Sequence, residues 1–261
     1  MKSTLVVKNL SYEKIFSNLS VDFKSNKLNF IAGPNSCGKT TLIKILSKQI
    51  HLENTIYYNN KLLENYSSDK IYNLYQTILA DDNYYFNYFS VEQIVDELLY
   101  KKDNSENAIN LSKKLLSILR LNKYLKYNPN NLDIAVKLKI RIMIALIIKP
   151  KFLLIDNLTS YLNKEEKHTI LSLLKELSTE ITIILTTNNL DDSLYGDNLY
   201  ILQKTIKLEG TPLEVLVQDN TLNKIGLSLP YMVDLSVKLK DYDLIEKIEL
   251  DWEKLVNELW K

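Results

Sequence analysis

Three short, largely apolar runs mark the strands of a buried sheet. They cover residues 28–32, 152–155 and 181–185. Runs without polar alternation are typical of parallel strands that are covered on both faces, whereas half-exposed strands alternate. Between the second and third runs, residues 165–177 carry apolar side chains at helical spacing. Because helix and parallel strand alternate along the chain, the pattern predicts an α/β core.

Between about residue 80 and residue 149 the pattern becomes helical. Ser90 followed by Gln93 has the form of a capping box, which opens a helix. Pro150 cannot continue a helix, so the last one is expected to end before it. The helices predicted in this stretch cover residues 91–100, 108–120 and 134–149.

The two ends of the chain have patterns of their own. Residues 4–7 and 19–23 read as short strands. The last residues place apolar side chains on one face of a helix, at Trp252, Leu255, Val256, Leu259 and Trp260. We therefore predict a core built from residues 1–79 and 150–228, a helical subdomain over 80–149 and a C-terminal helical extension over 229–261.

Residues 33–40 carry a complete phosphate-binding loop motif, G-x-x-x-x-G-K-[ST]. A predicted strand precedes the motif and residues 40–48 follow it as a helix, which is the context that makes the motif specific. The chain has only 5 glycines, and Gly33 and Gly38 occupy the two glycine positions of the motif. This arrangement predicts a nucleoside triphosphate site.

The motif also predicts individual roles. Lys39 is expected to bridge the β- and γ-phosphates, and the Thr40 hydroxyl is expected to ligate Mg²⁺. Asp156, at the end of an apolar strand, is the expected carboxylate partner of that ion. ATP and Mg²⁺ are therefore the predicted cofactors. The residues predicted to contact the nucleotide through the loop are Gly33, Pro34, Asn35, Ser36, Cys37, Gly38, Lys39, Thr40 and Thr41.

Charge and composition exclude several classes of protein. The formal net charge is +1, so charge predicts no polyanionic partner and no nucleic acid. Cys37 is the single cysteine, which leaves no disulfide framework and fits a reducing compartment. No run of about 18 apolar residues occurs, and the N-terminus reads directly as a strand. We therefore expect neither a membrane-spanning helix nor a signal peptide.

The chain resembles an ATPase of the ABC type, because several landmarks follow one another in family order. After the phosphate loop, Gln76 stands where the family carries its Q-loop glutamine. Residues 141–151 precede the strand that ends at Asp156 as the signature helix precedes the Walker B strand. Residues 158–163 (Leu-Thr-Ser-Tyr-Leu-Asn) are similar to the D-loop. The resemblance makes Gln76 a further expected nucleotide contact, and a metal ligand beside Thr40 and Asp156.

This resemblance also implies a fold. An ABC ATPase is an α/β P-loop NTPase, with a mixed, mainly parallel sheet at its core. N-terminal antiparallel strands and a helical insertion complete it. The predicted elements of this chain occur in that order.

The end of the chain is similar to one group in that family, the ATP-binding subunits of energy-coupling factor (ECF) transporters. The similar segments are residues 226–230 (GLSLP) with Leu235 and Leu239 after them, and residues 252–260 of the terminal helix. Residues 208–214 (LEGTPLE) are a further landmark, similar to a segment of the wider family. The resemblance implies a peripheral subunit on the cytoplasmic face of the membrane that couples ATP binding and hydrolysis to uptake of a vitamin or metal ion. The implied partners are a second ABC ATPase subunit, a transmembrane coupling subunit and a substrate-binding membrane protein.

One departure from the family is the missing LSGGQ signature. Counting back from Pro150 places residues 132–136 (Leu-Asp-Ile-Ala-Val) there, and no glycine lies between Gly38 and Gly196. Asp133 would present a carboxylate to the partner's γ-phosphate, with a repulsion of about 1–4 kcal/mol at a few ångströms. Aspartate is also a preferred cap of its own helix. In either role this segment is expected to have lost its function as a phosphate clamp.

Two side chains that drive hydrolysis in the family are replaced as well. Asn157 follows Asp156 where an active ATPase carries glutamate, and Asn188 holds the place of the switch histidine. A carboxamide is not a useful base, and loss of a positioned base costs about 10²–10⁴ in rate. The D-loop aspartate is replaced by Asn163. We therefore assign no catalytic residue and expect a site that binds ATP but hydrolyses it slowly, if at all.

Some aromatic positions remain open between two interpretations. Residues 84–86 and 88–89 are rich in Tyr and Phe. They either line a groove that receives a membrane subunit or pack within the helical insertion. The apolar stripe on the last helix either joins the core or contacts another subunit. Tyr12 and Phe16 are the candidates for stacking on adenine.

Three functions compete on this sequence. The first is the catalytically degenerate half of a heterodimeric transporter ATPase. The second is a nucleotide-sensing regulatory subunit that does not hydrolyse ATP, with all chemistry in the partner. The third, an ABC ATPase of translation or DNA repair, is disfavoured. Those proteins usually carry two fused nucleotide domains or a long coiled-coil insertion, and this chain has one short insertion.

Overall fold

The computed structural model describes residues 4–67, 71, 74–79 and 85–260. Its centre is a six-stranded sheet in the order β10-β9-β3-β8-β7-β6, in which all neighbours are parallel except β10 and β9. The strands are β3 (Leu28–Ala32), β6 (Tyr75–Leu79), β7 (Phe152–Asp156), β8 (Thr182–Thr187), β9 (Asn198–Gln203) and β10 (Thr205–Gly210). The three predicted apolar runs are β3, β7 and β8, and every residue of these strands is buried. The prediction of an α/β core with a mainly parallel sheet is confirmed.

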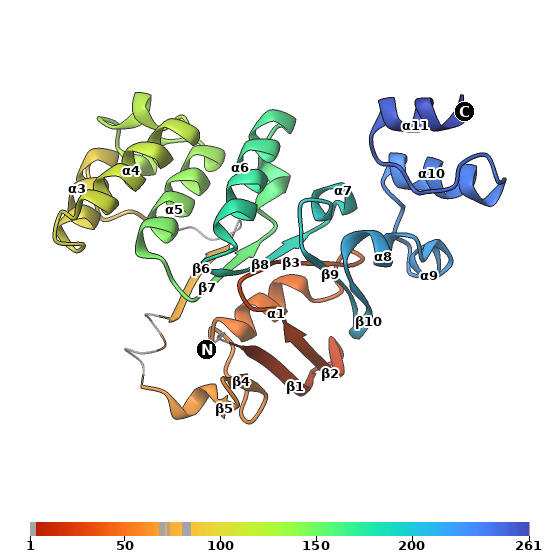
Figure 1. The fold of residues 1–261 in the computed structure, drawn as a ribbon. Coiled ribbons are helices and arrows are strands. Elements are labelled where there is room, and N and C mark those ends of the chain that lie inside the picture. Colours follow the sequence, from red (N-terminus) through yellow and green to blue (C-terminus); the bar gives the residue numbers. More distant parts are fainter. Residues whose placement is uncertain (1–3, 68–70, 72–73, 80–84, 261) are drawn as a thin grey trace.

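A smaller antiparallel sheet lies beside the N-terminal part of the core. Its order is β2-β1-β4-β5, with strands β1 (Leu5–Tyr12), β2 (Phe16–Phe23), β4 (Ile56–Tyr58) and β5 (Lys61–Leu62). The predicted strand patterns at residues 4–7 and 19–23 are therefore parts of longer strands. Helix α1 (Lys39–Leu46) lies between the two sheets, and its apolar residues share one buried cluster with both of them (Figure 1).

The other face of the six-stranded sheet is covered by longer helices. These are α3 (Val91–Tyr100), α4 (Glu106–Ile118), α5 (Ile134–Ile148) and α6 (Lys164–Leu177). Their buried residues form one continuous cluster with β3, β7 and β8. The helical stretch between β6 and β7 therefore shares the core of the sheet rather than forming a separate one.

The sequence places these helices correctly and misses details of their ends. Ser90 accepts a hydrogen bond from the Gln93 N–H, as a cap should. The Gln93 side chain, however, accepts from the Phe89 N–H (3.0 Å) instead of from Ser90. A complete capping box occurs at the start of α6, where Asn163 and Glu166 exchange both bonds. Asn163, at the D-loop aspartate position, thus has a structural role in this chain.

Short elements complete the structure. Four 3₁₀ turns lie among the described residues: η1 (Leu63–Asn65), η2 (Asn122–Tyr124), η3 (Pro129–Asn131) and η4 (Leu158–Tyr161). Further helices are α7 (Leu190–Ser193), α8 (Pro212–Leu216), α9 (Asp219–Lys224), α10 (Tyr231–Asp241) and α11 (Trp252–Leu259).

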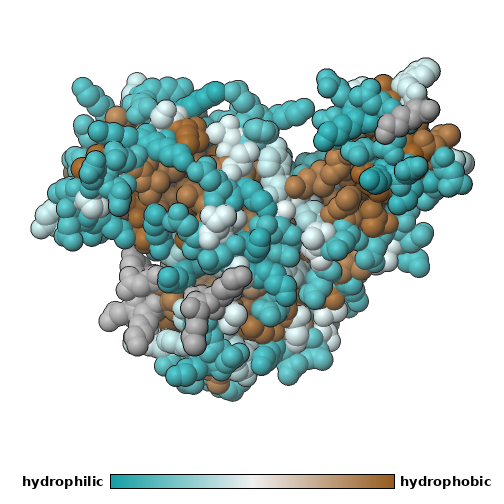
Figure 2. Space-filling model, in the orientation of Figure 1, coloured by the Kyte–Doolittle hydropathy of each residue, from teal (hydrophilic) through white to brown (hydrophobic). Residues whose placement is uncertain are grey.

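The apolar stripe predicted on the last helix divides between two environments. Leu255 is 1% exposed, whereas Trp252 and Trp260 are 58% and 85% exposed. Ser236 of α10 is fully buried and hydrogen bonds to the backbone N–H and C=O of Glu249, which holds the segment before α11 against α10. Figure 2 shows apolar surface gathered over the C-terminal elements. The stripe therefore both packs inward and faces outward.

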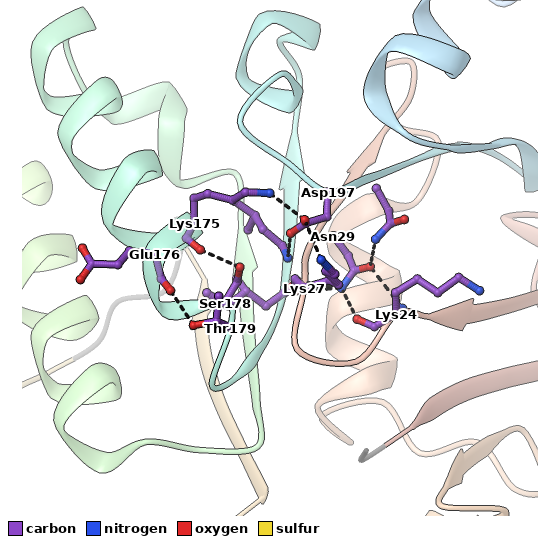
Figure 3. Close-up of polar contacts among 11 residues, drawn as sticks. Lys24, Lys27, Asn29, Lys175, Glu176, Ser178, Thr179 and Asp197 are labelled. Atoms are coloured by element: carbon purple, nitrogen blue, oxygen red, sulfur yellow. Dashed lines mark hydrogen bonds and ion pairs between the residues drawn. The ribbon is translucent and has the colours of Figure 1, made fainter. Parts of the chain in front are cut away.

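A polar cluster fixes the end of the sheet at which β3 begins (Figure 3). Asn29 of β3 is fully buried, and its amide N–H groups donate to three backbone carbonyls, those of Lys24, Lys27 and Ile183. Asp197 pairs with Lys175 (2.7 Å) at the end of α6 and with Lys27 (3.2 Å), and it accepts the Leu28 N–H. The cluster joins β3, α6 and β9 at one point.

These contacts shift the titration of Asp197. Burial raises the pKa of the Asp197 carboxyl, but hydrogen bonds from Lys175, from the Leu28 N–H and from Lys27 outweigh it, so this pKa lies below its usual range. A carboxylate with a depressed folded pKa stabilises the fold above its unfolded pKa of about 3.9. That contribution is lost as pH falls through the folded value.

We expect Asp197→Asn to lower the free energy of unfolding by about 1–2 kcal/mol at pH 7, because two charged partners lose their carboxylate. The difference from wild type should shrink as pH falls below about 4, because the unfolded wild-type chain then binds a proton at Asp197, and it should vanish once the folded carboxyl is protonated as well. Urea unfolding between pH 7 and pH 3 measures this. Glu180→Gln, which removes an exposed pair with Lys149, is the matched control with little effect. A difference that stays constant down to pH 3 would contradict the assignment.

Candidate nucleotide-binding site

The phosphate loop connects β3 to α1 at the carboxyl end of the parallel strands. Ser36 and Gly38 have positive φ angles of 61° and 102°, and only glycine adopts the latter without strain. A Cβ atom on Gly38 would lie 2.5 Å from Ile15 Cγ2, and one on Gly33 would lie 2.2 Å from the Leu202 carbonyl oxygen. The two glycines are therefore required by backbone conformation and by close packing.

Lys39 lies along the loop with its ammonium group held by backbone carbonyls. Its Nζ donates to the carbonyls of Gly33 (2.7 Å) and Pro34 (2.9 Å), and the side chain is largely buried. Burial lowers the pKa of Lys39, while Cys37 and Asp156 act in the opposite direction. Burial likewise raises the pKa of the Cys37 thiol beside it. The site thus contains a preplaced cation within a loop of backbone N–H groups.

Asp156 joins the loop to the sheet. It is 3% exposed at the end of β7, and its two oxygens accept hydrogen bonds from different elements. Thr40 Oγ1 of α1 donates to Oδ2 (2.7 Å), and Thr186 Oγ1 of β8 donates to Oδ1. Thr186 was not predicted from the sequence, although a hydroxyl near the end of a buried apolar strand is the available signal.

The groups present suit Mg²⁺ bound to a nucleotide. Thr40 and Asp156 bring a hydroxyl and a carboxylate oxygen into contact, and Mg²⁺ prefers such oxygen ligands together with phosphates and water. When bound, Mg²⁺ would neutralise phosphate charge there. Lys39 would contact phosphate oxygens, and the loop N–H groups would hold the remaining charge.

Asn157 and Asn188 meet beside this metal position. Asn157 has a left-handed backbone (φ 47°), and its N–H donates to the Thr186 carbonyl (3.2 Å) and hydroxyl (3.0 Å). Its Oδ1 accepts from Ser160 Oγ (2.6 Å) and from Asn188 Nδ2 (3.4 Å). Two amides are therefore in contact where the family carries its glutamate and histidine.

These residues surround one cavity of about 370 Å³. Of the predicted loop residues, Gly33, Pro34 and Cys37 do not line it; Gly33 and Pro34 contribute carbonyls to Lys39, and Cys37 lies beside that ammonium. Ile15, which the sequence did not indicate, does line it. The full lining is Ile15, Asn35, Ser36, Gly38, Lys39, Thr40, Thr41, Asp156, Asn157 and Asn188.

The aromatic candidates for adenine have different surroundings. Phe16 is 2% exposed and belongs to the core cluster, where its ring closes against Gly38. It is therefore not available for stacking. Tyr12 is half-buried at the end of β1, and Ile15 in the following turn presents the apolar side chain that reaches the cavity.

The structure does not bring Gln76 to the site. Gln76 lies near the start of β6 and pairs with Leu153, whereas Leu79 pairs with Asp156. Side chains along a strand point alternately to its two faces. Tyr75 and Leu79 belong to the cluster that contains α1, and Ile78 belongs to the cluster on the other face of the sheet. Gln76 is two positions from Ile78 and therefore lies on that other face, away from α1. The predicted nucleotide and metal roles of Gln76 are therefore wrong. The residues that follow β6, 80–84, lie outside the described part of the chain.

Asp133 lies at the start of α5, as predicted, but its side chain does not make the predicted capping hydrogen bond. It is the N-cap residue of α5, yet its side chain makes no capping hydrogen bond and is exposed. The prediction that Asp133 caps its own helix is therefore wrong. Its carboxylate is directed to solvent at the place where the family carries the signature serine and glycines.

The aromatic residues before α3 differ in their exposure to solvent. Phe86 is 2% exposed, and its N–H and C=O are held by the Asn130 amide. Tyr85 and Phe89 are 70% and 83% exposed. Tyr84 lies outside the described residues. Phe86 therefore packs within the helical insertion, whereas a groove for a membrane subunit stays a prediction for Tyr85 and Phe89.

A phosphate loop, a buried carboxylate at the end of a parallel strand and an antiparallel side sheet define a P-loop ATPase of the ABC class. Residues 16–160 match the family described as ABC transporter, which is more than half of the chain. The chain belongs to this family.

Relatives and solved structures agree with this class. The energy-coupling factor transporter ATP-binding protein EcfA1 of Mycoplasma mobile is 25% identical over 94% of this chain and 90% of its own length. The spermidine/putrescine import ATP-binding protein PotA of Borreliella afzelii is 30% identical over 83% of this chain and 65% of its own. The structure of cbiO1 from Clostridium perfringens, part of the ABC transporter complex cbiONQ, has a TM-score of 0.68 at 24% identity and covers 92% of this chain and 100% of that one. This likeness establishes the fold.

None of the helices within residues 4–67, 71, 74–79 and 85–260 combines the length and apolar character that crossing a bilayer requires.

We expect Lys39→Ala to weaken binding of Mg²⁺-ATP by about tenfold or more, because a charge-assisted phosphate contact is lost. Gln76→Ala should leave the affinity within about twofold of wild type, because Gln76 faces away from α1. Isothermal titration of both variants measures this. Equal losses in the two variants would contradict the placement of Gln76.

Proposed function

We propose that this chain is the ATP-binding subunit of an ECF-type ABC transporter and the catalytically degenerate half of a heterodimer. It would couple ATP binding and hydrolysis in the complex to uptake of a vitamin or metal ion. The observation that carries this proposal is the Asn157–Asn188 contact beside Lys39, Thr40 and Asp156. Lys39, Thr40 and Asp156 supply the groups that we expect to hold nucleotide and metal. Amides stand at the two positions where an active ATPase of the family carries the groups that activate water.

The chemistry of the site follows from these groups. Hydrolysis needs an acceptor for the proton of the attacking water, and a carboxamide oxygen is a poor base. Asn157 Oδ1 is in addition already hydrogen bonded to Ser160 and Asn188. We therefore expect the chain's own site to bind Mg²⁺-ATP and to turn it over slowly.

A partner ATPase would supply the missing functions. In a head-to-tail dimer, the segment at Asp133 would approach the phosphate loop of the partner. The exposed Asp133 carboxylate is a poor ligand for a phosphate. A compensating contact in the partner would therefore be required, for which the proposal assigns a second ABC ATPase subunit with intact catalytic residues.

The membrane partners are assigned on two grounds. The relative from Mycoplasma mobile is an ECF transporter ATP-binding protein and is aligned over nearly its full length. Tyr85 and Phe89 also expose two aromatic rings beside α3, and aromatic side chains are enriched at protein interfaces. We propose a transmembrane coupling subunit and a substrate-binding membrane protein as partners, a peripheral position on the cytoplasmic face, and no nucleic-acid partner.

The amide pair also supports a second candidate, a nucleotide-sensing regulatory subunit that does not hydrolyse ATP. In that case the state of the nucleotide would set a conformation, and the partner would perform all chemistry. The two candidates differ in what accompanies the chain at the membrane.

Co-purification of the tagged chain from native membranes in mild detergent, followed by mass spectrometry, tests the transporter assignment. We expect a second ABC ATPase with intact glutamate and histidine, together with a polytopic membrane protein. Recovery of the chain alone in the aqueous fraction would contradict the transporter and favour the regulator. Lys39→Ala, which weakens nucleotide binding, is a control for assembly that requires ATP.

Restoring the missing groups tests the chemical explanation. In the purified complex, Asn157→Glu combined with Asn188→His should raise ATP turnover by about tenfold or more, because a proton acceptor returns beside the metal position. Adding Lys39→Ala to the double variant should remove the gain. Unchanged turnover in the double variant would show that the amides are not what limits hydrolysis.

A further inference from the structure

The orientation of the Asn157 amide is fixed by its neighbours. Its Oδ1 accepts one hydrogen bond from Ser160 Oγ (2.6 Å) and one from Asn188 Nδ2 (3.4 Å). A carboxamide oxygen has two lone pairs, so both are engaged. The backbone N–H of Asn157 is held by Thr186, which fixes the position from which the side chain extends.

The opposite end of the same amide has no such partner. Within the part of the chain that the structure describes, no hydrogen bond is made by Asn157 Nδ2, although Asn157 is half-buried. Asn157 and Asn188 both line the cavity that contains Lys39 and Thr40. Two N–H donors thus remain on a residue whose acceptor is occupied.

A donor in this position has chemistry that a glutamate cannot have. A carboxylate only accepts hydrogen bonds and repels a phosphate, whereas an amide N–H donates to phosphate oxygens. The asparagine therefore replaces a group suited to accept a proton from water with a group suited to bind an anionic oxygen. The terminal phosphate of a triphosphate is the anionic group that distinguishes it from a diphosphate.

We propose that Asn157 is a specificity-determining residue that recognises the γ-phosphate, so that the site prefers nucleoside triphosphate to diphosphate and retains it. Asn188 and Ser160 are positioning residues, because they occupy Oδ1 and leave Nδ2 as the free end. This inference rests on the proposed function, since it requires that the cavity binds nucleotide. With this preference, the site would distinguish bound nucleoside triphosphate from diphosphate within the complex.

Affinities for a triphosphate analogue and for ADP test the proposal. The probes are the β,γ-imido analogue of ATP and ADP, each with Mg²⁺, which displace a fluorescent nucleotide from the full chain. Wild type should bind the triphosphate analogue about tenfold more tightly than ADP, as expected for a hydrogen bond to a charged group. Asn157→Asp and Asn157→Ala should both remove most of this preference.

The two variants separate the lost donor from an added charge. Asn157→Asp keeps an acceptor for Ser160 and Asn188 but removes the N–H groups, while Asn157→Ala removes the donor without adding charge. Asn122→Asp, in the exposed turn η2, adds the same charge away from the cavity and should change neither affinity. Thermal unfolding of each variant checks that its fold is retained.

The possible results separate the proposal for Asn157 from the proposed function. Loss of preference in Asn157→Asp alone would overturn the proposal, because charge repulsion would then explain it. Equal affinity of wild type for the two nucleotides would also overturn it while leaving the proposed function intact. Failure of wild type to bind either nucleotide would overturn both. A wild-type preference that both Asn157 variants lose supports the proposal, even if one of them is less stable.

Discussion

The buried carboxylate of Asp156 is the contact on which the site depends. Its two oxygens bind a hydroxyl from α1 and a hydroxyl from β8, so one side chain at the end of β7 fixes the loop helix against the sheet. Thr186, the partner from β8, also accepts the backbone N–H of Asn157. The position of the predicted metal ligand and the position of the residue that replaces the family's catalytic glutamate are therefore set by the same hydroxyl. A site can keep this framework while the side chain at position 157 changes.

Nucleotide binding and hydrolysis are separable here because they rely on different kinds of group. Binding uses backbone N–H groups, a buried ammonium and two oxygen ligands, which depend on the shape of the loop. Hydrolysis uses a proton acceptor at one point, and its loss does not disturb that shape. The contact between Asn157 and Asn188 replaces an acid–base pair with two neutral amides. Under the proposed function, this replacement would let an ABC ATPase fold hold ATP in a complex whose chemistry takes place in another subunit.

Local sequence predicts those parts of the structure that local physics determines. The buried runs become β3, β7 and β8 because strands covered on both faces must be apolar. The phosphate loop follows from its two glycines and the lysine. Gln76 was misplaced because the register of β6 against β7 is decided by pairing across the sheet, and Leu79 is the residue opposite Asp156. The bonds that fix the Asn157 amide join residues up to 31 positions apart, and the reach of Ile15 into the cavity depends on the turn between β1 and β2. Neither leaves a periodic signal in the chain.

We infer that this site holds ATP without consuming it. Identification of the bound nucleotide over time tests this inference. The purified chain would be loaded with ATP and Mg²⁺, separated from free nucleotide, and its bound nucleotide measured by native mass spectrometry at intervals. We expect the protein still to carry intact ATP after many minutes. Conversion of the bound nucleotide to ADP within seconds would contradict it.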